Sequence, residues 1–260
     1  MNYIRVPVTQ SFSWPEGIRA AVSLTFDDGR RSQWQYGVPL LNDFGVKATF
    51  YVLPKALEEN LERWQAVCAR GHEIGNHSLT HPCSGNFPFA QKNPLEEYSL
   101  EMMAKELDEA SQRLAKSLGT FPESFAYPCG QKFVGRGAEA RSYVPLVADR
   151  FLAGRGWRDE HHNAPGFCDM AQLFAVPIDG LDADDAKAQI DAAAREGGWL
   201  IFAGHDIGSK KTTRQVTLEK TLVAVCEYVR ENSPGIWLDT VKTIANYVRD
   251  FRREMSSQQQ

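Results

Sequence analysis

Residues 20–29 read Ala-Ala-Val-Ser-Leu-Thr-Phe-Asp-Asp-Gly, an apolar run that ends in two carboxylates and a glycine. The apolar run is typical of a buried strand, whereas Asp-Asp-Gly by itself is a common turn sequence. Asp27 and Asp28 are therefore predicted to stand at the carboxyl end of a strand, where parallel α/β folds place their functional groups. This stretch predicts a fold of alternating strands and helices with its chemistry at one edge.

The rest of the chain alternates in the same way. After residues 22–26, further strands are expected at residues 48–53, 72–76, 123–127, 150–153, 173–178, 199–203 and 236–238. Helices are expected in the stretch that ends at Gly45 and at residues 57–69, 100–118, 183–195, 216–229 and 241–251. About seven β/α units without a linker predict one α/β domain, a parallel sheet or barrel wrapped by helices. It would span residues 1–260, with an N-terminal extension at 1–19 and a disordered tail at 255–260.

Composition and charge exclude several classes of protein. The chain has 260 residues, of which 43% are hydrophobic and 24% charged, and its net charge is −4. Without a long run of like charge, neither nucleic acid nor a membrane surface is an expected partner. The first ten residues lack a signal profile, and five scattered cysteines fit a reducing compartment, so we expect a cytoplasmic protein. A secreted chain that had lost its signal would look the same, and the sequence does not define the oligomeric state.

A second motif, His77-Ser-Leu-Thr-His81, adds two imidazoles. Imidazoles at i and i+4 would share one side of a helical turn, and Asp28 from another strand end would complete a set of three metal ligands. Three protein ligands leave coordination positions open for water, which is typical of catalytic zinc sites rather than structural ones. The arrangement indicates metal-assisted hydrolysis.

These two motifs, together with Gly71-His-Glu-Ile-Gly-Asn76, resemble the NodB-type polysaccharide deacetylases, carbohydrate esterases that remove N-linked or O-linked acetyl groups from sugars. The resemblance implies a distorted (β/α) barrel of about seven units. It also implies that Asp27 is the general base, and that Asp28, His77 and His81 bind a divalent metal. Zinc is the expected metal, with Co²⁺, Ni²⁺ or Mn²⁺ as alternatives.

The segment from Trp199 to Asp206 is an apolar strand that ends in histidine, and it matches the last motif of the family. The resemblance implies that His205 is the general acid, a role that suits imidazole because it titrates near neutrality. A core histidine bonded to backbone groups is the alternative. Asp206 would orient the imidazole or cap the next helix.

Residues 125–130, Phe-Ala-Tyr-Pro-Cys-Gly, match the family imperfectly, because Ala126 stands where relatives carry an arginine. The resemblance places Tyr127, Pro128, Cys129 and Gly130 against the substrate, with the Tyr127 N–H as oxyanion donor. The sequence does not reveal which residue replaces the arginine near Asp27.

A further departure lies at Asp179-Gly-Leu-Asp182-Ala183, where Ala183 stands in place of the family's tryptophan. Asp179 and Asp182 are either functional residues or ordinary loop and helix-cap carboxylates. With the arginine and the tryptophan both absent, we expect a substrate pocket that is wider and less basic than in relatives.

Other polar and aromatic residues have two interpretations each. His161 and His162 lie in a polar loop and either contact substrate or form a solvated turn. The Cys129 thiol is expected to pack rather than react. Trp157, Phe167 and Trp199 either line a sugar or acyl pocket or belong to the core.

The sequence thus predicts a metal-dependent hydrolase that removes acetyl groups from a carbohydrate. One alternative is a cytosolic C–N hydrolase of a small non-sugar amide or cyclic imide, for which the same barrel with altered motifs is used. Another is a non-catalytic, sugar-binding pseudoenzyme, suggested by the two altered segments but opposed by the intact Asp27 and His205.

Overall fold

A computed structural model describes residues 12–257. Its main sheet is parallel throughout and has the strand order β7-β4-β3-β2-β1-β9-β8, with β12 paired to the start of β1. The strands are β1 (Ala20–Asp27), β2 (Thr49–Val52), β3 (Glu73–Asn76), β4 (Ser124–Ala126), β7 (Ala153–Arg155), β8 (Val176–Pro177), β9 (Trp199–Gly204) and β12 (Ile236–Leu238). The predicted strands thus form close to their expected positions.

The sheet curls until its two ends approach each other. A parallel bridge joins Arg155, at the end of β7, to Leu173, just before β8. The Gly156 N–H donates to the Leu173 carbonyl at 2.8 Å, and the Leu173 N–H donates to the Gly154 carbonyl at 2.8 Å. The expected α/β fold class, a distorted barrel of about seven strand units, is confirmed.

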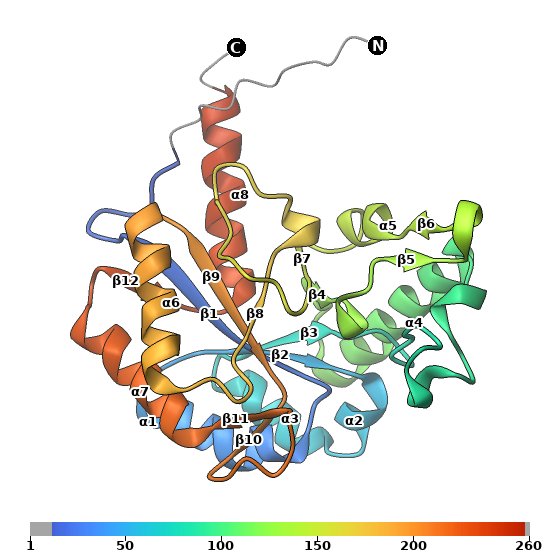
Figure 1. Cartoon of the computed structure of the whole chain (residues 1–260), viewed down its shortest axis with the longest axis horizontal. Coiled ribbons are helices and arrows are strands. Elements are labelled where there is room, and N and C mark those ends of the chain that lie inside the picture. The colour runs from blue at the N-terminus through green and yellow to red at the C-terminus, as the bar shows by residue number, and fades with distance from the viewer. Residues whose placement is uncertain (1–11, 258–260) are drawn as a thin grey trace.

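Helices cover the outside of the curled sheet, and α6 and α7 lie side by side on one flank (Figure 1). The helices are η1 (Gln33–Gly37), α1 (Val38–Asp43), α2 (Pro54–Glu58), α3 (Leu61–Ala69), η2 (Pro88–Ala90), η3 (Leu95–Glu97), α4 (Leu100–Leu118), η4 (Pro128–Gly130), η5 (Gly137–Glu139), α5 (Val144–Ala148), η6 (Met170–Gln172), α6 (Ala183–Glu196), α7 (Glu219–Glu231) and α8 (Val241–Ser257). Two small strand pairs, β5 (Phe133–Val134) with β6 (Arg141–Ser142) and β10 (Asp206–Gly208) with β11 (Val216–Leu218), lie outside the main sheet.

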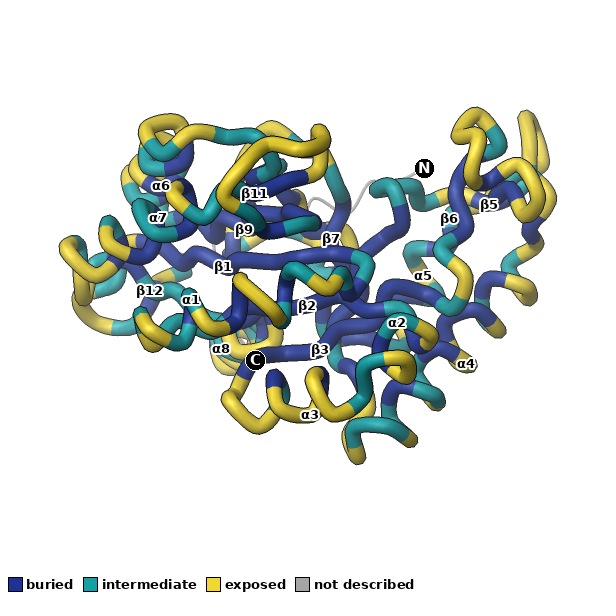
Figure 2. Tube along the Cα trace, turned by 90° about the horizontal axis from the view of Figure 1, so that it is seen from below, coloured by how far each residue is buried: buried dark blue, intermediate teal, exposed yellow. Residues whose placement is uncertain are grey.

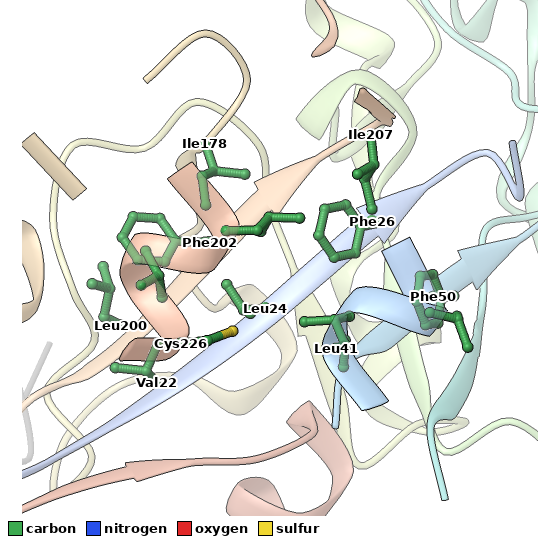
Figure 3. Close-up of a cluster of buried hydrophobic side chains, with 14 of the residues drawn as sticks. Val22, Leu24, Phe26, Leu41, Phe50, Ile178, Leu200, Phe202, Ile207 and Cys226 are labelled. Carbon is green, nitrogen blue, oxygen red and sulfur yellow. The ribbon is translucent and has the colours of Figure 1, made fainter. Parts of the chain in front are cut away.

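Alternate side chains of β1 point to opposite faces of the sheet, and each face belongs to a separate buried layer. Val22, Leu24 and Phe26 point to the outer layer, where they meet β9 and the inner faces of α1 and α7 (Figure 3). Figure 2 shows that β1, β2 and β3 are buried along their length. Burying one such large apolar side chain contributes about 1.5–3 kcal/mol, so this layer fixes the strand carrying Asp27.

The other layer fills the inside of the curled sheet and holds the start of α8. Thr49 accepts the Val241 N–H at 2.9 Å, and Glu73 accepts the Lys242 N–H at 2.8 Å. The first turn of α8 is therefore capped by side chains of β2 and β3. Glu73 is buried, and this burial raises the pKa of its carboxyl group.

Several expected boundaries need correction. The helix expected at 57–69 is split into α2 and α3 near Asn60, and the helix expected at 216–229 begins only at Glu219, because residues 216–218 pair with β10. Most of the expected N-terminal extension, residues 1–11, and residues 258–260 of the expected tail lie outside the described residues. Residues 255–257 are not a disordered tail, because they continue α8.

Between residues 12 and 257, every helix is too short or too polar to cross a membrane.

Candidate active site

The carboxyl ends of three parallel strands, β1, β3 and β9, bring the predicted residues together. Asp27 ends β1 and Asp28 follows it, His77 follows β3, and His205 follows β9. All four line one cavity of about 380 Å³, called the catalytic cavity below, and His81 lines it as well.

Asp28, His77 and His81 form a compact group of potential metal ligands. The Asp28 Oδ1 atom lies 3.4 Å from His77 Nε2 and 3.7 Å from His81 Nε2. Zinc–nitrogen bonds of about 2.0–2.1 Å place two donors of a tetrahedron about 3.4 Å apart, so this donor set fits a divalent cation. His77 Nδ1 lies 2.9 Å from the Ala126 carbonyl oxygen, which fixes the ring so that the Nε2 lone pair faces Asp28.

The segment from His77 to His81 is not the predicted helical turn. Ser78 and His81 both have positive φ angles, of 65° and 57°. Side chains hold the backbone instead: Asn76 accepts the Ser78 N–H at 2.6 Å, Ser78 accepts the His81 N–H at 3.0 Å, and Glu106 of α4 accepts the Leu79 and Thr80 N–H groups. The two imidazoles converge through this side-chain-bonded turn rather than through helical periodicity.

The turn after β1 explains the Asp-Asp-Gly sequence. Asp28 and Gly29 have φ angles of 75° and 68°, and a Cβ atom at Gly29 would lie 2.5 Å from Val52. Arg30 donates to Asp28 Oδ2 at 2.7 Å, which leaves Oδ1 directed at the histidines. Burial raises the pKa of Asp28, but the hydrogen bond and charge of His77, with the charge of Arg30, hold it well below its usual range. Burial and the neighbouring His77 lower the pKa of His81 to about 4, so its imidazole is neutral and able to bind metal at neutral pH.

Asp27 is paired with an arginine that the sequence analysis missed. Arg155 is fully buried, and its Nη2 donates to Asp27 Oδ1. The guanidinium also stacks over the Tyr51 ring at 4.7 Å. Arg155 is the register partner of Ala126 across β7 and β4, so the absent arginine is supplied by the neighbouring strand. The expectation of a less basic site is therefore wrong at Asp27.

His205 is oriented by Asp179 and not by Asp206. Its Nδ1 lies 2.6 Å from Asp179 Oδ2, and Thr217 donates to the other oxygen of Asp179 at 2.8 Å. Asp206 instead accepts from Arg30 at 2.6 Å and from Ser32 at 2.7 Å.

Two further candidates, Asp182 and Trp157, have different roles in the structure. Asp182 caps α6 by accepting the Asp185 N–H, which is the helix-cap alternative. Trp157, two residues after Arg155, lines the catalytic cavity and meets the His205 ring edge-on at 4.8 Å. A tryptophan from the β7 loop thus stands against His205, although Ala183 carries no ring.

The Tyr127 N–H cannot serve as the expected oxyanion donor. It donates to the Arg155 carbonyl at 3.0 Å, and the Tyr127 side chain is buried, with its hydroxyl bonded to Ala171. Cys129 lines the cavity, with a φ angle of 54°, and its N–H has no acceptor in the described part of the chain. The neighbouring Pro128 and Gly130 shape this turn. Among residues 127–131, Tyr127, Gly130 and Gln131 donate their N–H groups to backbone carbonyls and Pro128 has none, so the Cys129 N–H is the one that remains without an acceptor.

Two further aromatic residues line the cavity and were not predicted. Phe87 and Phe89 stack at 5.3 Å, and Phe89 is 65% exposed. Of the other aromatic candidates, Trp199 is buried in the core and Phe167 is exposed away from the cavity lining.

Comparison with known proteins identifies the family. Residues 16–142 match the family model described as polysaccharide deacetylase. Peptidoglycan-N-acetylglucosamine deacetylase PgdA of Listeria monocytogenes is 40% identical over 62 residues, which are 24% of this chain and 13% of that protein. The chain belongs to the polysaccharide deacetylase family. The segments that match curated relatives make up less than a third of the length of those proteins.

Solved structures extend the likeness over nearly the whole chain. A putative polysaccharide deacetylase from Mycobacterium smegmatis has a TM-score of 0.64 at 16% identity, covering 92% of this chain and 93% of that one. Puue allantoinase has a TM-score of 0.62 at 15% identity, covering 90% of this chain and 91% of that one. At such low identity the likeness concerns the fold alone.

Proposed function

We propose that this protein is a metal-dependent hydrolase that removes an acyl group, acetyl in the simplest case, from a carbohydrate. The observation that carries the proposal is the convergence on one cavity of a metal-ligand group, a separate buried carboxylate and an oriented histidine. Asp28, His77 and His81 leave Asp27 free for proton transfer, and His205 approaches from another strand. Family membership supports acetylated sugars as the substrate class.

In this mechanism Asp28, His77 and His81 hold a divalent cation, most suitably Zn²⁺. When bound, the cation would polarise a water molecule and the acyl oxygen, a contribution of several kcal/mol to the transition state. Asp27 removes the proton from the attacking water. Arg155 positions Asp27 by donating to one carboxylate oxygen, which leaves the other oxygen to accept the proton.

The developing oxyanion would accept from the Cys129 N–H, which belongs to a residue that lines the cavity and has no other acceptor in the described part of the chain. His205 gives a proton to the leaving oxygen or nitrogen from Nε2. Asp179 supports this by holding Nδ1–H, which fixes the ring and stabilises the protonated imidazole. Gln215 lies 3.2 Å from Nε2 and has to yield this position to the leaving group.

The small-amide alternative shares the same reacting groups and differs only in what fills the cavity. Its specific support is the size of the cavity, about 380 Å³, with Phe87, Phe89 and Trp157 as apolar walls. A cavity of this size also accepts one acylated sugar unit at the end or side of a chain. The complete set of reacting groups argues against the pseudoenzyme alternative.

A substrate panel separates these possibilities. Purified protein with Zn²⁺ would be incubated with N-acetylated and O-acetylated sugars, acetylated oligosaccharides, linear amides and cyclic imides, and acid or amine release would be measured. We expect acyl release from at least one acetylated sugar, with Asp27→Asn as the inactive control. Turnover confined to the amides or imides would replace the proposal by its alternative, and no turnover of any class would favour the pseudoenzyme.

A further inference from the structure

Two histidines and a glutamate form a second potential metal-binding group far from the catalytic cavity. Glu196 Oε2 lies 3.3 Å from His162 Nε2 and 3.8 Å from His161 Nε2. The three donor atoms all lie within 4.8 Å of one another. His161, His162 and Glu196 are called the surface histidine cluster below.

The spacing of this cluster is that of the proposed catalytic ligands. The corresponding carboxylate–imidazole separations at Asp28 are 3.4 and 3.7 Å. Both groups present one carboxylate oxygen to two Nε2 atoms near the donor spacing of a tetrahedral zinc site, about 3.4 Å. The donor chemistry, two imidazoles and one carboxylate, suits a divalent transition metal.

A backbone bridge and close packing fix the residues on both sides of the cluster. Asn163, next to His162, forms an antiparallel bridge with Trp199, through hydrogen bonds of 2.8 and 2.9 Å. A Cβ atom at Gly198 would lie 2.1 Å from the His162 ring, so this glycine allows the imidazole to pack where it does. Glu196 is the last residue of α6, two positions before that glycine.

A hydrogen bond holds the His161 imidazole in the tautomer that can bind a metal through Nε2. His161 Nδ1 lies 3.0 Å from the His162 carbonyl oxygen, which makes Nδ1 the protonated nitrogen and leaves the Nε2 lone pair facing Glu196. The His162 side chain is only 6% exposed.

The position of the cluster separates it from catalysis. Its anchor, Trp199, begins β9, whereas His205 follows the other end of that strand. Five strand residues at about 3.3 Å each place the two ends about 16 Å apart. Neither His161 nor His162 lines the catalytic cavity, which argues against substrate contact, one of the two interpretations of these residues.

We propose that the surface histidine cluster binds a second divalent transition-metal ion, Zn²⁺ by its donor set. The ion would tie the loop after β7 to the end of α6, with water completing its coordination. Its function is to stabilise this edge of the barrel, because it lies away from the reacting groups.

The proposal is tested by counting zinc ions on the full-length protein without an affinity tag. Equilibrium dialysis against Zn²⁺, followed by metal analysis, would be applied to the wild type and to His161→Ala, Glu196→Gln and Asp28→Asn. We expect two ions for the wild type and one for each variant. Glu231→Gln changes an exposed glutamate at the end of α7, and as the control it should keep two.

Thermal unfolding provides a second measurement. Zn²⁺ should raise the Tm of Asp28→Asn but not that of Asp28→Asn/His161→Ala, while equal Tm values in chelator would show that His161→Ala folds normally. One ion on the wild type and none on Asp28→Asn would overturn the proposal and leave the catalytic metal intact. One ion on the wild type that is lost only in His161→Ala would support this site and count against the proposed catalytic one.

Discussion

Arg155 of β7 donates a hydrogen bond to the Asp27 carboxylate from the strand position that lies opposite Ala126 of β4. The family pattern places an arginine at the position of Ala126, and here the cation comes from the next strand. Because register partners of adjacent strands point to the same face of a sheet, both positions reach the inside of the barrel. Asp27 therefore keeps a guanidinium partner although the family motif has lost it.

This relationship predicts that the arginine can be moved. Arg155→Ala should lower kcat about tenfold to a hundredfold, because a hydrogen bond to a charged group contributes about 1.5–3 kcal/mol. The double variant Ala126→Arg/Arg155→Ala should recover part of that loss. Both would be compared by steady-state kinetics and metal content, and KM and bound metal should stay near the wild-type values. An Arg155→Ala enzyme with unchanged kcat would show that the pair has no part in positioning Asp27.

The two adjacent carboxylates are predicted to have different tasks. His77→Ala and His81→Ala should lose both metal and activity, because each removes one of three protein ligands. Asp27→Asn should keep the metal while kcat falls about a hundredfold or more, the scale of general-base loss. Metal analysis beside kinetics separates the cases. Release of the metal by Asp27→Asn would require the roles of Asp27 and Asp28 to be reassigned.

Asp179 is predicted to act through His205. Asp179→Asn should lower kcat about a hundredfold, because the amide can stabilise the wrong tautomer and not the protonated ring. Asp182→Ala is the matched control from the same segment. It removes only the cap of α6, so kcat should be unchanged while stability falls by about 0.5–2 kcal/mol. Equal kinetic losses in the two variants would point to a general disturbance of the segment.

Stability is predicted to fall in mild acid through His72, which is independent of catalysis. Burial, with the charges of Lys47 and Arg70, lowers the pKa of His72 from 6.5 to about 4, and its Nδ1 accepts the Ala48 N–H at 3.1 Å. Between these pH values the unfolded chain binds more protons than the folded one. The free energy of unfolding therefore drops as pH falls from 6.5 towards 4, by about 3 kcal/mol at most.

His72→Asn keeps an acceptor for the Ala48 N–H but cannot titrate. Urea unfolding in chelator at several pH values should give this variant a flatter dependence between pH 4 and 6.5 than the wild type. Parallel curves for the two proteins would assign the acid sensitivity to other groups.

The approximate positions of the strands and the main site residues could be predicted because they depend on local patterns. The apolar run before Asp27 and the one before His205 each mark a buried strand, and such strands bring their carboxyl ends to one edge. The turn from His77 to His81 could not be predicted in the same way. Its shape depends on Glu106, which is distant in sequence and contributes through α4.

Arg155 could not be identified from the sequence because strand register is a property of the folded sheet. The only sequence signal was an arginine shortly after the strand expected at residues 150–153, two residues before Trp157. The Cys129 N–H was missed for a related reason. Only the pairing of β4 with β7 reveals that the Tyr127 N–H is already bonded to the Arg155 carbonyl, which is why we propose the Cys129 N–H as the donor.

The central claim, hydrolysis that depends on a metal at Asp28, His77 and His81, is tested most directly by acyl release from an acetylated substrate after metal removal. Chelated protein should be inactive, and one equivalent of Zn²⁺ or Co²⁺ should restore turnover to the wild type but not to His81→Ala. Undiminished turnover by metal-free protein, or restoration of His81→Ala by the same metal addition, would contradict the account.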